Sequence, residues 1–328
     1  MKFAVGSKAM TSRTDRRILN LLFGTFLSMI FSFTGVFGQA GGRVVSVTFD
    51  DLPATGPSST LTRLTYINEG ILKSLRDHRI PAAGFVNESK LFVEGEIDER
   101  AALLERWLDD GHVLGNHTFS HIAIDRASLE EYKEDLIRGE TVTRMLLAAR
   151  GQKLKYFRHT QLRTGPDKEY AQRLSSLLES RGYTVAPVTI DNNEYVFAAI
   201  YASARDRNDR AGMKRIADAY VAYMENVFDH FEMVSRDFLG YEPPQILLLH
   251  ANEINADHFG RLADMIKARG YRFVTIDEAL RDKAYGLPEA QSQRGLSWIH
   301  RWMLAKGLEI REEPDVPEWV AEEFRSRR

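Results

Sequence analysis

Val47-Thr48-Phe49-Asp50-Asp51 is an apolar segment that runs directly into two adjacent carboxylates. Neighbouring carboxylates repel each other unless a cation or a proton lies between them. Within a strand they point to opposite faces, but at a strand end both can turn into one opening. The segment therefore predicts a cation site at a strand end or, in the simpler interpretation, a helix cap and a turn that Pro53 and Gly56 favour.

Short apolar runs of this kind alternate with longer amphipathic segments from Arg43 onward. This alternation predicts an α/β fold of repeated βα units, a barrel-like array with its functional residues at the carboxyl ends of the strands. The seven expected strands are 43–49, 82–86, 112–115, 154–157, 184–188, 246–249 and 272–276. The expected helices are 61–78, 98–110, 128–150, 167–180, 211–238, 257–268 and an aromatic helix at 296–306.

The 328-residue chain carries no cysteine, which excludes a disulfide scaffold, cysteine nucleophiles and thiolate metal sites. Any metal ion must be held by histidines and carboxylates. Basic residues, an uncharged run over 18–38 and small residues flanking Gln39 predict that residues 1–40 are an export signal. A membrane anchor is the alternative, because the run is just long enough to span a bilayer. The remaining chain is acidic overall, which argues against a nucleic-acid partner.

A second cluster, Asn116-His117-Thr118-Phe119-Ser120-His121, follows the expected strand 112–115. Histidines four residues apart on a helical turn face the same way, at a separation that suits one small cation. Two histidines and one carboxylate leave an open position for water, as catalytic zinc sites do.

A third candidate is His250, which ends the apolar run Gln245-Ile246-Leu247-Leu248-Leu249. A histidine in this position is often structural. Here it shares the end of a strand with the other two clusters, and it can transfer a proton near neutral pH.

Five features occur in order: Thr-Phe-Asp-Asp, His-Thr-x-x-His, an arginine at a strand end, an acidic-aromatic pair and Leu-x-Leu-His. Together they resemble the polysaccharide deacetylase family, also called the NodB homology domain or carbohydrate esterase family four. The similarity covers about residues 43–280. It implies a distorted (β/α)7 barrel as the catalytic domain, residues 41–282, with residues 283–328 as a helical extension that packs on the barrel.

The resemblance also implies roles for individual residues. Asp50 matches the catalytic base, and Arg158 matches the arginine that holds this base ionised. His250 matches the general acid, and Glu194 matches the residue that orients it. The implied metal ligands are Asp51, His117 and His121, with Zn²⁺ as the expected ion, and the implied substrate-binding residues are Tyr195, Leu248 and Gln161.

Two departures from the family pattern mark a divergent member. Thr160, Gln161 and Leu162 follow Arg158 where the family has a proline and commonly tyrosine and glycine. Leu52 follows the acidic pair where a glycine is usual. The first change affects the substrate groove and the main-chain donor to the oxyanion, for which the N–H of Gln161 is the candidate.

The sequence thus predicts an exported, metal-dependent hydrolase, secreted or periplasmic, that removes N-acetyl groups from amino-sugar polymers such as peptidoglycan or chitin. One alternative is a hydrolase of the same fold acting on a non-sugar amide or an O-acetyl ester. A non-catalytic glycan-binding relative is another. A phosphoryl-transfer enzyme is disfavoured, because two histidine ligands suit zinc better than Mg²⁺ and the sequence has no P-loop.

Overall fold

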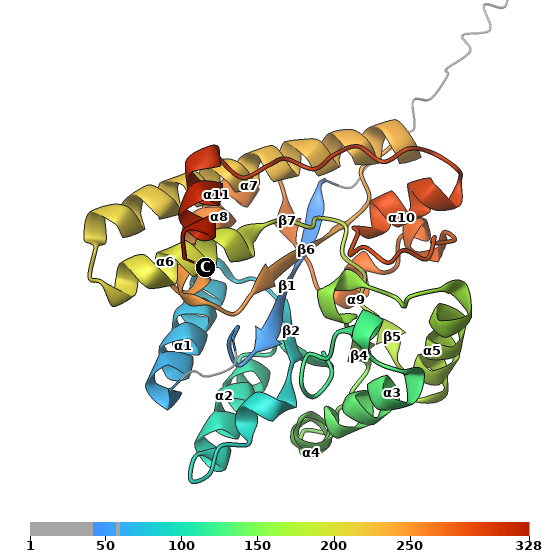
Figure 1. The fold of residues 1–328 in the computed structure, drawn as a ribbon, viewed down its shortest axis with the longest axis horizontal. Helices are drawn as coiled ribbons and strands as arrows, with labels where there is room; N and C mark the ends of the chain where they lie inside the picture. The colour runs from blue at the N-terminus through green and yellow to red at the C-terminus, as the bar shows by residue number, and fades with distance from the viewer. Residues whose placement is uncertain (1–41, 57–59, 328) are drawn as a thin grey trace, which may run out of the picture. The chain divides into compact units, whose positions relative to one another are not determined.

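The fold is organised around β1 (Val44–Leu52), the central strand of a parallel sheet in the computed structural model, which describes residues 42–56 and 60–327 (Figure 1). Every residue of β1 after Val44 is buried, as expected for a parallel strand that is covered on both faces. The other strands of the described chain are β2 (Ala82–Val86), β3 (Val113–Asn116), β4 (Tyr156–Phe157), β5 (Thr184–Val185), β6 (Gln245–His250) and β7 (Arg272–Phe273).

The strand order is β5-β4-β3-β2-β1-β6, and β7 pairs with the beginning of β1. The two edges of this order are joined by one segment, residues 184–190. Its first part pairs with β4, and its last residue, Ile190, forms a parallel bridge with Leu247 on β6. The sheet therefore curls into a distorted barrel, and the prediction of seven strands in a (β/α) barrel is confirmed.

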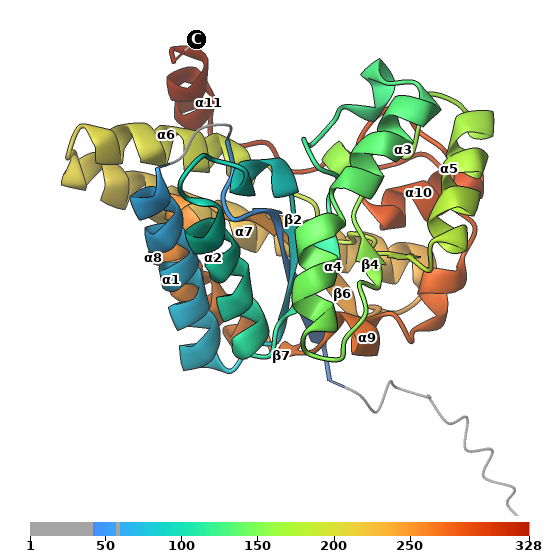
Figure 2. The same ribbon diagram turned by 90° about the horizontal axis from the view of Figure 1, so that it is seen from below.

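Helices surround the sheet, with α1 and α2 beside β1 and β2 and with α3 and α5 near β4 and β5 (Figures 1 and 2). Figure 2 also shows α11 projecting from the molecule beside α6. The helices of the described chain are α1 (Leu61–His78), α2 (Ile97–Asp109), α3 (Leu129–Arg138), α4 (Thr141–Ala148), α5 (Lys168–Ser180), α6 (Glu194–Asp206), α7 (Arg210–Leu239), α8 (Glu253–Ala268), α9 (Ile276–Ala279), α10 (Trp298–Ala305) and α11 (Glu318–Arg325). Four short 3₁₀ helices are η1 (Glu88–Leu91), η2 (Ile124–Arg126), η3 (Thr160–Leu162) and η4 (Lys283–Gly286).

The single helix expected over 128–150 is wrong, because α3 ends at Arg138 and α4 begins at Thr141. Gly139 lies between them, and a Cβ atom there would meet the main chain of Thr118 and Phe119 at 2.7 Å. The Phe119 N–H also donates a hydrogen bond to the Asp135 carbonyl. The break therefore lets the loop that carries the two site histidines pack against the helix end.

The C-terminal residues share the core of the barrel. Trp298 and Trp302 of α10 are buried, and so is Val320 of α11. All three belong to the same apolar cluster as Phe49 of β1. The division into a domain of residues 41–282 and an extension of residues 283–328 stays a prediction. The segment expected to direct export, residues 1–40, lies outside the described residues. None of the helices in the described ranges is long and apolar enough to span a membrane.

Candidate active site

The candidate site forms where four parallel strands end. Asp50 and Asp51 are two of the last three residues of β1, and β6 ends at His250. His117 directly follows β3, and Arg158 directly follows β4. Because the strands are parallel and adjacent, their carboxyl ends meet at one face of the barrel. Asp50 and His250 are direct partners across the β1–β6 ladder.

Asp51, His117 and His121 form the metal trio, whose ligand atoms all lie within 4.8 Å of one another. Asp51 Oδ1 lies 3.9 Å from His117 Nε2 and 3.7 Å from His121 Nε2. This oxygen is buried without a hydrogen-bond partner. The Lys90 ammonium lies 3.6 Å from it, too far for a hydrogen bond. A buried carboxylate oxygen that faces two imidazole nitrogens is a suitable ligand, so the three side chains fit a divalent ion with nitrogen and oxygen ligands.

His117 is held in the tautomer that a metal ligand requires. Its Nδ1 lies 2.9 Å from the Arg158 carbonyl oxygen, which can only accept a hydrogen bond. The proton is therefore on Nδ1, and the Nε2 lone pair faces Asp51. Burial lowers the pKa of His117 well below its usual value, and the neighbouring His121 lowers it further. The neutral imidazole is thus the stable form, and it is the form that binds metal ions.

Asp50 is the candidate base and lies against the Arg158 guanidinium, with Nη1 at 3.4 Å from either carboxylate oxygen. Arg158 is fully buried and also donates from Nη2 to Thr48 Oγ1 at 3.0 Å. The charge of Arg158 lowers the pKa of Asp50, in the direction that the sequence predicts. Burial raises the pKa of Asp50 to about 6, and Arg158 offsets only part of that effect. A carboxylate with a pKa near neutrality is a better proton acceptor than an ordinary aspartate.

His250 is the candidate acid and is oriented by Glu194 on α6. Its Nδ1 lies 2.9 Å from Glu194 Oε2. The other carboxylate oxygen, Oε1, accepts hydrogen bonds from Asn252 Nδ2 at 2.5 Å and Asn255 Nδ2 at 2.6 Å. Burial lowers the pKa of His250, but the hydrogen bond and charge of Glu194 raise it to about 9. His250 is therefore protonated at neutral pH and can donate a proton.

The three residues expected to bind substrate lie in different surroundings. Leu248 is buried on β6. Tyr195 is 49% exposed, and its ring packs edge-on against Phe324 of α11. Gln161 is an exposed residue of η3 with a positive φ of 54°, and its carbonyl oxygen lies against Gly295 of the C-terminal region. Their predicted roles stay predictions.

Two residues that follow β2 escaped the sequence prediction. Asn87 is fully buried, and its Nδ2 donates to the His117 carbonyl at 2.7 Å. Lys90 Nζ donates to the Asp51 carbonyl at 3.0 Å and to Asn87 Oδ1 at 3.0 Å. Asn87 comes directly after a buried strand, so the same strand-end pattern that identified the other residues also applied to it.

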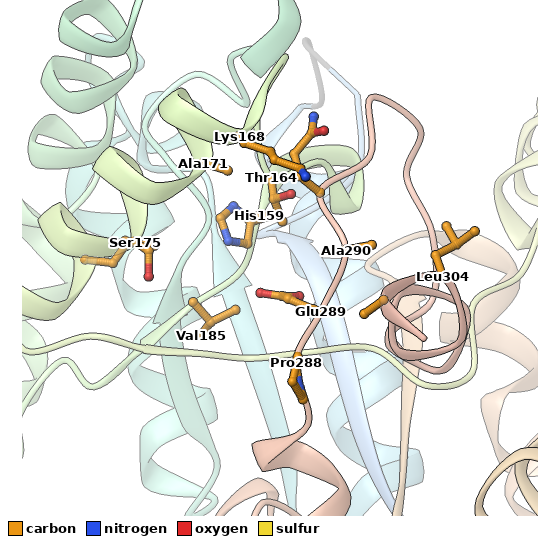
Figure 3. Close-up of a pocket in the computed structure, with 13 residues that line it drawn as sticks. His159, Thr164, Lys168, Ala171, Ser175, Val185, Pro288, Glu289, Ala290 and Leu304 are labelled. Atoms are coloured by element: carbon orange, nitrogen blue, oxygen red, sulfur yellow. The ribbon is translucent and has the colours of Figure 1, made fainter. Parts of the chain in front are cut away.

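One cavity in the described part of the chain adjoins the site, and a larger one lies elsewhere. A cavity of about 320 Å³ opens beside Asp51 and His121, and its other lining residues are Gly56, Ser89, Lys90 and Ser120. A second cavity of about 570 Å³ lies between α5 and residues 288–291, with His159, Lys168 and Glu289 on its walls (Figure 3). His159 stacks on Trp298, and burial lowers its pKa to about 3. The first cavity is the one that adjoins the metal trio.

Residues 38–186 match the family model described as polysaccharide deacetylase. The peptidoglycan-N-acetylglucosamine deacetylase of Bacillus cereus is 30% identical over 117 residues, which are 35% of this chain and 35% of the relative. The peptidoglycan-N-acetylglucosamine deacetylase PgdA of Listeria monocytogenes serotype 1/2a is 22% identical over 240 residues, 73% of this chain and 39% of the relative. This chain thus spans less than two fifths of the length of either curated relative.

Solved structures include a similar chain, the peptidoglycan deacetylase PdaC from Bacillus subtilis. It is 20% identical and aligns with a TM-score of 0.45 over 73% of this chain and 91% of that chain.

Proposed function

Because this chain is a divergent member of the polysaccharide deacetylase family, we propose that it is an exported, metal-dependent deacetylase that releases acetate from N-acetylated amino-sugar polymers. The names of the relatives, which are peptidoglycan deacetylases, favour peptidoglycan as the first substrate class to test. The predicted signal segment, residues 1–40, supports export, and the proposed location is the cell envelope or the medium.

One observation carries the proposal: a buried aspartate beside an arginine, a histidine paired with a glutamate and an Asp-His-His trio lie together where the parallel strands end. The proposed ligands are Asp51, His117 and His121, and the proposed ion is Zn²⁺, which suits two imidazoles and one carboxylate. When bound, such an ion polarises a carbonyl group and lowers the pKa of a water molecule.

The protein side chains supply the proton transfers of amide hydrolysis. Asp50 accepts the proton of the attacking water, and the guanidinium of Arg158 holds the carboxylate in position. His250 donates a proton to the departing amine, and Glu194 keeps its Nδ1 proton in place so that Nε2 faces the reaction. Asp50 and His250 are partners across adjacent strands, so both side chains can reach the same bond.

A second candidate function is hydrolysis of an O-acetyl ester or a non-sugar amide. It is favoured by the loop after Arg158, where Gln161 and Leu162 both have positive φ values, 54° and 52°. The main chain of η3 therefore follows an unusual path. The part of the substrate groove next to this loop can differ from that of the relatives.

The test is acetate release by metal-loaded protein from N-acetylglucosamine oligomers, peptidoglycan and acetylated xylan. Asp50→Asn is run in parallel, because it removes the base and keeps the size of the side chain. We expect release from an N-acetylated polymer and a loss of about 10²–10⁴-fold in Asp50→Asn. Release from acetylated xylan alone favours the hypothesis that the enzyme hydrolyses O-acetyl esters. No release from any substrate, with an ion bound, favours a non-sugar amide or a binding role.

A further inference from the structure

Lys90 of η1 lies beside the metal trio and links the two loops that carry it. Its Nζ donates to the Asp51 carbonyl and to Asn87 Oδ1, each at 3.0 Å. Asn87 in turn donates from Nδ2 to the His117 carbonyl. The main chain of η1 adds a second link, since the Ser89 N–H donates to the Phe119 carbonyl at 2.9 Å. Lys90 therefore bridges the aspartate and histidine sides of the site without an ion.

The Asp51 main chain needs such support. Its φ is 70°, in the left-handed region that a residue with a side chain adopts only at a cost in energy. The charged donor of Lys90 fixes the Asp51 carbonyl, and a hydrogen bond from an ionised donor is stronger than one between neutral groups. Lys90 thus stabilises the backbone conformation that presents the Asp51 carboxylate to the two histidines.

Charge balance gives Lys90 a second effect. Asp50 and Asp51 are adjacent buried carboxylates. The guanidinium of Arg158 lies against Asp50, and the ammonium of Lys90 lies 3.6 Å from Asp51 Oδ1, with a side chain that is 13% exposed. A divalent ion that binds Asp51 meets a positive charge already placed at the same oxygen, and like charges at this range repel each other.

We propose that Lys90 is a positioning residue that holds Asp51 in the absence of the metal ion and opposes the binding of that ion. The proposal rests on the metal site of the proposed function. It makes Lys90 a resident cation that replaces part of the charge of the ion. The side chain also lines the cavity of about 320 Å³ beside Asp51 and His121, so the ammonium has space to turn away from Asp51 when the ion binds.

The experiment compares wild type with Lys90→Met, which keeps the length of the side chain but loses the charge, and with Lys90→Arg, which keeps a charge. Lys73→Met is the matched control, because Lys73 is a 71% exposed lysine that pairs with Asp77 on the surface of α1. Two quantities are measured for each protein: the melting temperature after chelation, and the affinity for Zn²⁺ by competition with a chromogenic chelator. Absorption of the Co²⁺-loaded proteins reports the ligand geometry.

For the metal-free protein we expect Lys90→Met to melt about 5 °C lower than wild type, because a buried charge loses its partner. Its Zn²⁺ affinity should be at least about tenfold higher, which corresponds to about 1.4 kcal/mol. Lys90→Arg should stay near wild type in both quantities, and Lys73→Met should change neither. A Zn²⁺-dependent increase in melting temperature should be larger in Lys90→Met than in wild type.

Two failures are distinguishable. A wild-type protein that binds neither Zn²⁺ nor Co²⁺ overturns the metal site, and the role of Lys90 with it. A wild type that binds the ion, together with a Lys90→Met protein whose affinity is equal or weaker, overturns the role of Lys90 alone. A Co²⁺ spectrum that differs between wild type and Lys90→Arg also contradicts the proposal, since the charge at Asp51 is then not the property that matters.

Discussion

Glu194→Gln perturbs the candidate acid through a single atom. Two donors, Asn252 Nδ2 and Asn255 Nδ2, lie at Glu194 Oε1, so they hold the glutamine oxygen at that position. The glutamine N–H then faces His250 Nδ1, which lies 2.9 Å from Glu194 Oε2 in the native protein. To accept this hydrogen bond, Nδ1 must be unprotonated. The variant therefore disfavours the imidazolium form of His250, which carries a proton on Nδ1 as well as on Nε2.

The size of the effect follows from the electrostatics of the site. Burial lowers the pKa of His250, whereas Glu194 above all, with Asp51 and Asp50, raises it from 6.5 to about 9. At 1.36 kcal/mol for each pKa unit, the native site favours the protonated imidazole by roughly 3 kcal/mol. In Glu194→Gln only the charges of Asp51 and Asp50 still oppose burial, so the pKa of His250 falls. A fall to the ordinary value of 6.5 leaves about a tenth of His250 protonated at about pH 7.5, and acetate release then slows about tenfold.

The assay is the pH dependence of kcat/KM for acetate release, with folding checked by circular dichroism. Wild type should lose activity on the alkaline side near the pKa of His250, about 9, and Glu194→Gln should lose it well below that pH. Glu253→Gln is the control, because Glu253 is a buried glutamate of α8 that pairs with Arg63 instead of His250. An alkaline limb that stays in place in Glu194→Gln would refute the assignment of His250 as the acid oriented by Glu194.

Three further predictions concern the ion, the pH dependence of folding and the C-terminal region. Asp51→Ala should bind Zn²⁺ at least about a hundredfold more weakly than wild type in chelator competition, whereas Asp50→Asn should stay within about tenfold; equal losses would contradict the separate roles of the two carboxylates. Burial lowers the pKa of His112 from 6.5 to about 4. As the pH falls, His112 is therefore protonated in the unfolded state before it is protonated in the folded state. The folded state loses stability between pH 6.5 and about pH 4. The loss from about pH 7 to 5 is about 2 kcal/mol, and urea unfolding of His112→Gln should show a loss smaller by that amount; an unchanged pH dependence would exclude His112 as its source. Trp302→Ala removes a 1% exposed side chain and should lower the melting temperature by about 10 °C, and a change below about 2 °C would show that α10 adds little to the core.

The sequence predicted much of the order of elements, because the spacing of apolar residues is a local property. The strand 82–86 and the helix 61–78 were predicted with the bounds that the structure has. The helix α6 was not predicted, although its buried residues Val196, Phe197 and Ile200 have helical spacing. Asn193 is its N-cap residue, a usual start signal, although its side chain makes no capping hydrogen bond.

For the candidate site, the sequence indicated which strand ends carry chemical side chains. Asp50, Asp51 and His250 each end an apolar run, and parallel strands bring such ends together whatever the exact packing. The pKa of Asp50 was not predictable in this way. The direction of its shift depends on whether the effect of burial exceeds the effect of the Arg158 charge. Burial is a property of the complete tertiary packing.

The sequence by itself therefore determined much of the βα order and which strand ends carry acidic and imidazole side chains, because these depend on periodicity and on the direction of the strands. Only the tertiary structure decided how the barrel closes through residues 184–190 and which groups surround each functional side chain. Lys90 reaches Asp51 across 39 positions of the chain, and Asn255 reaches Glu194 across 61. Contacts at such separations leave no periodic trace in the sequence, since they arise when strands and helices pack and bring distant residues within hydrogen-bond distance.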